Sequence, residues 1–236
     1  MDFEELWPGG PRFRQSAHFR LSTDSVLLAD FTQPRSAARG VDLGCGSGIL
    51  MLLLAQKSEK LLLTGLELLP EAVEAARENL AENGLLTRAE LFCADLRRVR
   101  ELFRPGSFDL AVSNPPYFSE HTGAVSPQAG RAAARSETDC SLEELVRAAA
   151  WLLRTGGSLN LVYRPERLSE LCVCLSANGL EPKRLRFVCH RADSAPSLLL
   201  MEARRGGHPG LQIEPALILS DPDGGESEEY RRIYHR

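Results

Sequence analysis

The sequence predicts an α/β fold in which helices cover both faces of a mostly parallel, seven-stranded sheet. From Arg39 onward, short apolar runs alternate with helical patterns, which is typical of a parallel sheet with crossover helices. The length of 236 residues suits one α/β domain, and hydrophobic and charged fractions of 43% and 25% are ordinary for a globular protein.

The strands are expected in apolar runs and the helices in longer stretches between them. The predicted strands are 39–43, 61–66, 88–93, 108–113, 157–163, 183–190 and 196–204. The predicted helices are 48–57, 70–83, 141–154 and 165–178. Two helix starts have specific chemistry: Pro70 suits a first helical position, and Ser141 with Glu144 three residues later predicts a capping box.

The chain is expected to form a single domain with two flanking segments. Residues 39–205 are predicted to form the main domain. Residues 1–38 are expected to be an N-terminal cap or entry segment, with an extra helix after Ser22. Residues 206–236 are rich in glycine, proline and acidic residues, which predicts a partly ordered C-terminal tail.

Charge and cysteine content limit the possible partners. The net charge of −4 means that any role with nucleic acid needs a local basic patch. The six cysteines form no CxxC pair and have no histidine at zinc spacing, which predicts reduced thiols and no metal site. The acidic N-terminus is unlike a signal peptide, and the longest apolar run, 49–55, is too short for a membrane span. These features predict a cytoplasmic protein without membrane association; the oligomeric state is left open.

The segment from Asp42 to Gly48 (DLGCGSG) ends the first strand and opens a helix. Its glycines at 44, 46 and 48 give the free φ angles that such a tight turn requires. A dinucleotide fingerprint needs a glycine three residues after Gly46, where this chain has Ile49. The turn instead resembles the cofactor motif of Rossmann-like class I methyltransferases. That resemblance implies S-adenosylmethionine, with its amino-acid end on Gly44, Gly46 and Gly48, and with Asp42 organising the site.

Two further acids follow the next two strands. Glu67 lies about twenty residues beyond the glycine turn, where a carboxylate can accept hydrogen bonds from ribose hydroxyls. Asp95 matches the position that accepts from the cofactor's adenine amine in the methyltransferases. The carboxyl ends of strands are where open α/β sheets bind ligands, so both acids are predicted to bind cofactor.

The fourth strand is followed by Asn114-Pro115-Pro116-Tyr117. An exocyclic aromatic amine is a poor nucleophile because its lone pair is delocalised into the ring. The Asn114 side-chain oxygen and the Pro115 carbonyl can accept its two N–H groups and orient the lone pair, while the prolines stiffen the turn. Tyr117 offers a stacking face for the base. The four residues are predicted to be catalytic, and Asn114 also to border the cofactor. The motif resembles that of methyltransferases acting on adenine, cytosine or guanine amines or on the glutamine amide.

Segments before and after these motifs narrow the resemblance to one family. Residues 19–29, 134–137, 186–188 with Pro196, and 230–234 are similar to the bacterial tRNA(Val) adenine N6-methyltransferase family, and the similarity covers nearly the whole chain. Members of that family methylate the adenine at tRNA position 37, beside the anticodon. Ser136 stands where a histidine is expected before the glutamate, which leaves the role of that loop open.

The family resemblance implies a tRNA partner and an RNA-binding surface. Arg131, Arg135 and Arg186 are the main predicted contacts. The further candidates are Arg12, Arg14, Arg20, Arg164, Lys183, Arg184 and Arg191. A loop base is single-stranded and can be splayed into a pocket at low cost, which suits a one-domain enzyme.

Three alternatives are considered. Glutamine N5-methyltransferases of release factors share the core motifs but carry a substantial helical domain ahead of the glycine turn, whereas about forty residues precede it here. Ribosomal RNA guanine-N2 methyltransferases usually carry a duplicated second domain. A noncatalytic RNA-binding module would not need Asp42, Glu67 and Asn114 intact, so cofactor binding distinguishes it.

Overall fold

The computed structural model describes residues 2–15, 21–36, 38–115 and 140–236. Its centre is a sheet built from β3 (Arg39–Leu43), β4 (Leu62–Glu67), β5 (Ala89–Cys93), β6 (Phe108–Ser113), β7 (Leu153–Tyr163), β8 (Leu180–Cys189), β9 (Pro196–Arg205), β10 (Gln212–Ile213) and β11 (Leu217–Ile218). The strand order is β10-β8-β9-β7-β6-β3-β4-β5, and β11 also pairs with β8.

The sheet is mostly parallel, as predicted. Strands β5, β4, β3, β6 and β7 run parallel, and β9 is antiparallel to both β7 and β8. The chain order reverses at β3, because β4 lies on one side of it and β6 on the other. Ligands bind open α/β sheets at such a switch point. The glycine turn after β3 and the reaction motif after β6 therefore start from neighbouring strand ends.

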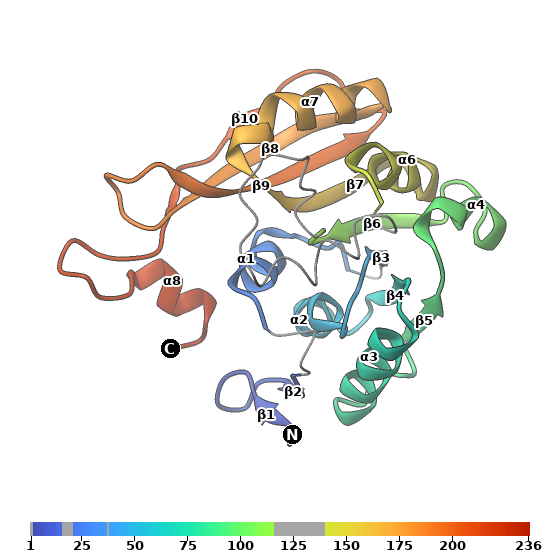
Figure 1. The fold of residues 1–236 in the computed structure, drawn as a ribbon, viewed down its shortest axis with the longest axis horizontal. Helices are drawn as coiled ribbons and strands as arrows, with labels where there is room; N and C mark the ends of the chain where they lie inside the picture. Colours follow the sequence, from blue (N-terminus) through green and yellow to red (C-terminus); the bar gives the residue numbers. More distant parts are fainter. Residues whose placement is uncertain (1, 16–20, 37, 116–139) are drawn as a thin grey trace, which may run out of the picture.

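Helices cover both faces of the sheet (Figure 1). One group consists of α1 (Thr23–Phe31), α2 (Ile49–Lys57) and α3 (Pro70–Glu82). The opposite group consists of α4 (Val99–Leu102), α6 (Leu142–Leu152) and α7 (Leu168–Ala177). The predicted capping box is present: Glu144 N donates to Ser141 Oγ at 3.2 Å, and Ser141 N donates to Glu144 Oε2 at 2.8 Å.

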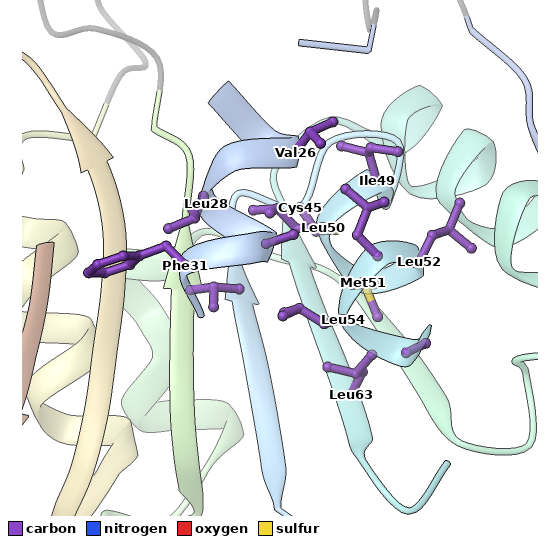
Figure 2. Close-up of a cluster of buried hydrophobic side chains, with 14 of the residues drawn as sticks. Val26, Leu28, Phe31, Cys45, Ile49, Leu50, Met51, Leu52, Leu54 and Leu63 are labelled. Atoms are coloured by element: carbon purple, nitrogen blue, oxygen red, sulfur yellow. The ribbon is translucent and has the colours of Figure 1, made fainter. Parts of the chain in front are cut away.

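The apolar run 49–55 forms most of α2 and is buried along its whole length. Figure 2 shows side chains of α1, such as Val26 and Leu28, in one cluster with Ile49 and Leu50 of α2. Packing against α1 and the sheet therefore explains why this helix is apolar all round. Throughout the described ranges, every helix is too short or too polar to cross a membrane.

The sheet has two strands more than the seven predicted, and both come from the C-terminal segment. Strands β10 and β11 pair in parallel with β8, and a short helix, α8 (Glu228–Ile233), follows them. Leu217 and Ile233 are buried in the core. Residues 206–236 are thus held in place by strand pairing and by a few buried apolar residues. The glycine-, proline- and acid-rich composition of this segment does not indicate these contacts.

The N-terminal segment forms a two-stranded hairpin, β1 (Glu4–Glu5) and β2 (Arg12–Phe13). Its backbone is held by α3, because Arg12 N donates to Asn83 Oδ1 at 2.8 Å. The two terminal segments also meet each other: the rings of Trp7 and His235 stack with centroids 4.2 Å apart. Both segments therefore pack onto the body formed by residues 39–205.

Candidate active site

The glycine turn joins β3 to α2 in a conformation that favours glycine. The φ angles are +79° at Gly44, +52° at Gly46 and +82° at Gly48. A Cβ on Gly48 would also lie 3.2 Å from the Ala76 Cβ of α3, so a side chain here would fit only if its neighbour shifted. A Cβ on Gly44 would meet nothing within 4 Å. Gly48 therefore serves packing, whereas Gly44 leaves open space at the strand ends for a ligand.

Glu67 supports the glycine turn from the end of β4. Its Oε2 accepts a hydrogen bond from Gly46 N and its Oε1 accepts one from Leu69 N, both at 3.0 Å. Each carboxylate oxygen has a second acceptor position, so both can still take ribose hydroxyls. The structure thus adds a role in shaping the turn to the predicted role in cofactor binding.

Asp42 lies beneath the turn and is only 1% exposed. Neither of its carboxylate oxygens has a hydrogen-bond partner among the described residues. Burial, with a smaller contribution from the negative charge of Glu67, raises the pKa of Asp42 to about 8. An isolated buried carboxyl group of this kind is unfavourable unless a donor or a cation approaches it. The group is therefore suited to a ligand that carries an amine.

Asp95 follows β5 at the same edge of the sheet, beside Glu67. Ala94 N donates to Glu67 O at 2.8 Å, which joins the two strand ends. Asp95 caps a short 3-10 helix, η1 (Leu96–Arg98), and accepts from Arg97 N at 2.9 Å. The hydrogen bond from the Arg97 side chain is the main reason why the pKa of Asp95 is lowered. The carboxylate is thus ionised and fixed in place, while its proposed contact with adenine remains a prediction.

Asn114 directly follows β6 and is oriented by the first residues of α1 and its cap. Its Nδ2 donates to Ser25 Oγ at 3.0 Å and to Ser22 Oγ at 3.3 Å. In the described ranges no donor reaches Asn114 Oδ1, which is left to accept from a substrate amine. The preceding Ser113 Oγ donates to Leu43 O at 2.7 Å, so the reaction motif is tied to the first residue before the glycine turn.

Some predicted site residues lie outside the described residues. Pro115 is buried next to Asn114, but Pro116 and Tyr117 of the same motif fall in the range that is not described. The same holds for Arg20, Arg131 and Arg135 among the predicted RNA contacts. The roles assigned to these five residues stay predictions.

Most of the other predicted RNA contacts form ion pairs with neighbouring acids. The pairs are Arg12–Glu82, Arg14–Glu78, Arg184–Glu202, Arg184–Glu214, Arg186–Glu229 and Arg191–Asp193. The Arg186 side chain is only 15% exposed and also donates to Pro215 O at 3.0 Å. Arg186 thus holds α8 and the preceding segment against β8, and its role as an RNA contact stays a prediction.

The sequence did not identify three residues that shape the site. Ser22 and Ser25 orient Asn114, and Asn79 of α3 donates to Ser47 O in the glycine turn at 3.0 Å. Asn79 is 1% exposed, and its Oδ1 also accepts from Arg14 N at 2.8 Å. The available signal was an asparagine inside a predicted helix, because a buried amide at such a position needs hydrogen-bond partners.

A metal site is not evident in this region. The described residues contain no group of three or more histidine, cysteine, aspartate or glutamate side chains that could hold a metal ion. The chemistry available at the strand ends comes from carboxylates, hydroxyls, backbone groups and the Asn114 amide.

Comparison with known proteins shows the family to which the chain is similar. The family model described as methyltransferase small domain matches residues 17–170. A relative from Tolumonas auensis, named tRNA1(Val) (adenine(37)-N6)-methyltransferase, is 33% identical over 212 residues, covering 89% of this chain and 86% of the relative. A protein of the same name from Escherichia coli O157:H7 is 30% identical over 217 residues, covering 91% and 86%.

Solved structures agree on the fold. A predicted O-methyltransferase from Agrobacterium tumefaciens has a TM-score of 0.73 at 22% identity, covering 90% of this chain and 96% of that one. Geranyl diphosphate C-methyltransferase from Streptomyces coelicolor A3(2), solved with Mg²⁺, geranyl diphosphate and S-adenosyl-L-homocysteine, has a TM-score of 0.57 at 14% identity, covering 77% and 79%. The expected Rossmann-like class I methyltransferase fold is confirmed.

Proposed function

The chain belongs to the methyltransferase small domain family, and from this premise we propose that it methylates the N6 amine of an adenine in tRNA, at position 37, with S-adenosylmethionine as donor. The relatives that match most of this chain are named for that activity. The observation that carries the proposal is the Asn114 side chain, with its Nδ2 held by Ser22 and Ser25 and its Oδ1 free of described donors, beside the glycine turn.

The described residues fit S-adenosylmethionine. When bound, this cofactor supplies an electrophilic methyl group on a sulfonium. Asp42 has two buried, unpartnered oxygens that suit the cofactor's amine, and Gly44 opens onto free space at the same strand ends. Glu67 is the last residue of β4 and Asp95 follows the end of β5, where they can accept from ribose hydroxyls and from the adenine amine.

Asn114 is proposed to orient the substrate amine. Its Oδ1 and the Pro115 carbonyl accept the two N–H groups, so that the nitrogen lone pair points toward the methyl group. The bound cofactor would donate its methyl group to this nitrogen, with the sulfonium sulfur as leaving group, and the methylated nitrogen would lose one proton to solvent. No base has to act before the attack, because the amine is neutral. A tRNA substrate places the proposed activity in the cytoplasm.

The test is methylation of total tRNA with a radiolabelled methyl donor, followed by nucleoside analysis. Label in N6-methyladenosine, mapped to the base beside the anticodon, is the expected result. Asn114→Ala is the matched control and should label the tRNA about 100-fold or more slowly. Label in a protein substrate with unlabelled tRNA would instead support the glutamine alternative, and label in N2-methylguanosine the guanine alternative.

A further inference from the structure

A hollow lies at the end of the sheet opposite the reaction motif. It has a volume of about 660 Å³, and its lining includes Arg100 of α4, Arg147 and Trp151 of α6, Arg154 of β7 and Arg205 of β9. We call this hollow the arginine groove. No aspartate or glutamate is among its lining residues. In a chain with a net charge of −4, four arginines around one acid-free hollow form a local basic patch.

Most of this positive charge is not neutralised by neighbouring acids. Arg154 forms an ion pair with Asp109. Arg205 donates to a neutral acceptor, the Asn178 carbonyl, at 2.9 Å. Arg100 and Arg147 are exposed, and within the described ranges neither forms an ion pair. The arginines predicted from the sequence as RNA contacts differ in this respect, since most of them are paired with carboxylates.

The groove also presents an aromatic surface. The Arg100 guanidinium lies 4.8 Å from the ring centroid of Trp151, and Trp151 Nε1 donates to Phe103 O at 3.3 Å. The Trp151 ring is thereby fixed, and it holds Arg100 over the groove. Guanidinium groups suit phosphate oxygens because they donate in a rigid fork, and such contacts provide affinity without reading sequence.

We propose that the arginine groove binds the phosphate backbone of the tRNA substrate, at a part of the molecule away from the methylated base. This inference rests on the proposed function. Strand β6 separates the two places: Gly106 lines the groove just before Phe108, and Asn114 follows Ser113 at the far end. Six residues at about 3.3 Å each give a separation of about 20 Å. An RNA that contacts both the groove and Asn114 must therefore extend beyond the loop that carries the methylated base.

The test compares two double variants that each remove two exposed arginines. Arg100→Ala with Arg147→Ala removes the unpaired charges of the groove. Arg77→Ala with Arg231→Ala removes two exposed arginines from α3 and α8 and serves as the control with equal net charge. Binding of full-length tRNA is measured by fluorescence anisotropy at several salt concentrations. Thermal melting and the affinity for S-adenosylmethionine are measured for each protein.

The groove variant is expected to bind tRNA at least about tenfold more weakly than wild type at physiological salt, and its salt slope should fall by up to about two. The control should bind like wild type, and melting and cofactor affinity should be unchanged in both. Hydroxyl-radical footprinting at saturating protein should show lost protection at nucleotides distant from the methylated loop, with protection around the target adenine retained.

Equal tRNA affinity and equal salt slope in the groove variant and the control would overturn the inference, and would leave the groove to another anionic partner, such as an acidic protein. A different outcome would contradict the proposed function without contradicting the inference about the groove. If wild-type protein leaves adenine unmethylated but loses RNA affinity on groove substitution, the groove stands and the activity is reassigned.

Discussion

Ser25 Oγ accepts a 3.0 Å hydrogen bond from Asn114 Nδ2 and thereby connects α1 to the end of β6. Ser22 Oγ accepts from the same amide at 3.3 Å, and it also accepts from Ser25 N at 3.3 Å as the cap of α1. These contacts direct the NH₂ group toward α1. An inverted amide would present donors to a substrate amine that itself donates, so the orientation of Asn114 decides whether it can hold that amine.

Ser25→Ala should lower kcat by about tenfold, because the loss of one hydrogen bond lets the Asn114 amide rotate away from the productive orientation. Cofactor affinity and melting temperature should stay close to wild type. Steady-state methylation kinetics measure kcat, and calorimetry measures the cofactor affinity and the melting temperature. Ser25→Thr keeps the hydroxyl and should retain most of the activity; equal kcat in the alanine variant would show that the serine contact has no role in turnover.

Asn114→Ala should bind S-adenosylmethionine nearly normally and lose turnover by a factor of about 100 or more, as expected for one preorganised polar contact in the transition state. Steady-state kinetics with tRNA and calorimetry with cofactor separate the two effects. A kcat within a factor of two of wild type would remove Asn114 from the reaction.

Glu67→Gln should weaken cofactor binding by about tenfold or more. The carboxylate accepts from Gly46 N and Leu69 N, and a glutamine would turn an NH₂ group toward one of these N–H donors. Glu71→Gln, on the exposed surface of α3, is the matched control and should bind normally. Unchanged cofactor affinity in the Glu67 variant would mean that the Glu67 side chain does not contribute to cofactor binding.

Asp42→Asn should change how stability depends on pH. The pKa of Asp42 is about 8 in the folded protein against 3.8 for a solvent-exposed aspartate, so between these values the folded state binds more protons than the unfolded state. Asp42 then contributes its full stabilising effect below about pH 4, and the effect is lost as the pH rises through 8.

The cofactor-free Asp42→Asn variant should therefore melt at least about 3 °C higher than wild type near pH 8, with a smaller difference near pH 5. Calorimetric melting at several pH values checks this result. An equal difference at both pH values would mean that Asp42 ionises normally. The same variant should bind S-adenosylmethionine more weakly, because the amine loses its anionic partner.

The main body of the fold was predictable because each element has a local signature. The seven predicted strands and four predicted helices all appear, since apolar runs, Pro70 and the Ser141 cap determine them locally. Strands β10 and β11 were missed because two-residue strands depend on pairing with β8, which is distant in the sequence.

The motifs of the site could be predicted from the sequence, but the side-chain contacts that join them could not. Glycines and acids at strand ends are recognisable as patterns, whereas the contact of Ser25 with Asn114 joins residues 89 positions apart. The arginine groove likewise draws its residues from α4, α6, β7 and β9. Charges that look equivalent in sequence differ once the fold shows which of them have acidic neighbours.

The pairing of β10 and β11 with β8 also covers one edge of the sheet. β8 is ten residues long and would otherwise present an open row of backbone donors and acceptors to other molecules. Gln212 and Ile213 cover Arg184 and Leu185, and Leu217 and Ile218 cover Val188 and Cys189. The strands left outermost are only two residues long and are separated by Pro215, which cannot donate a backbone hydrogen bond. By covering β8, the C-terminal segment leaves a less favourable edge for pairing with other molecules.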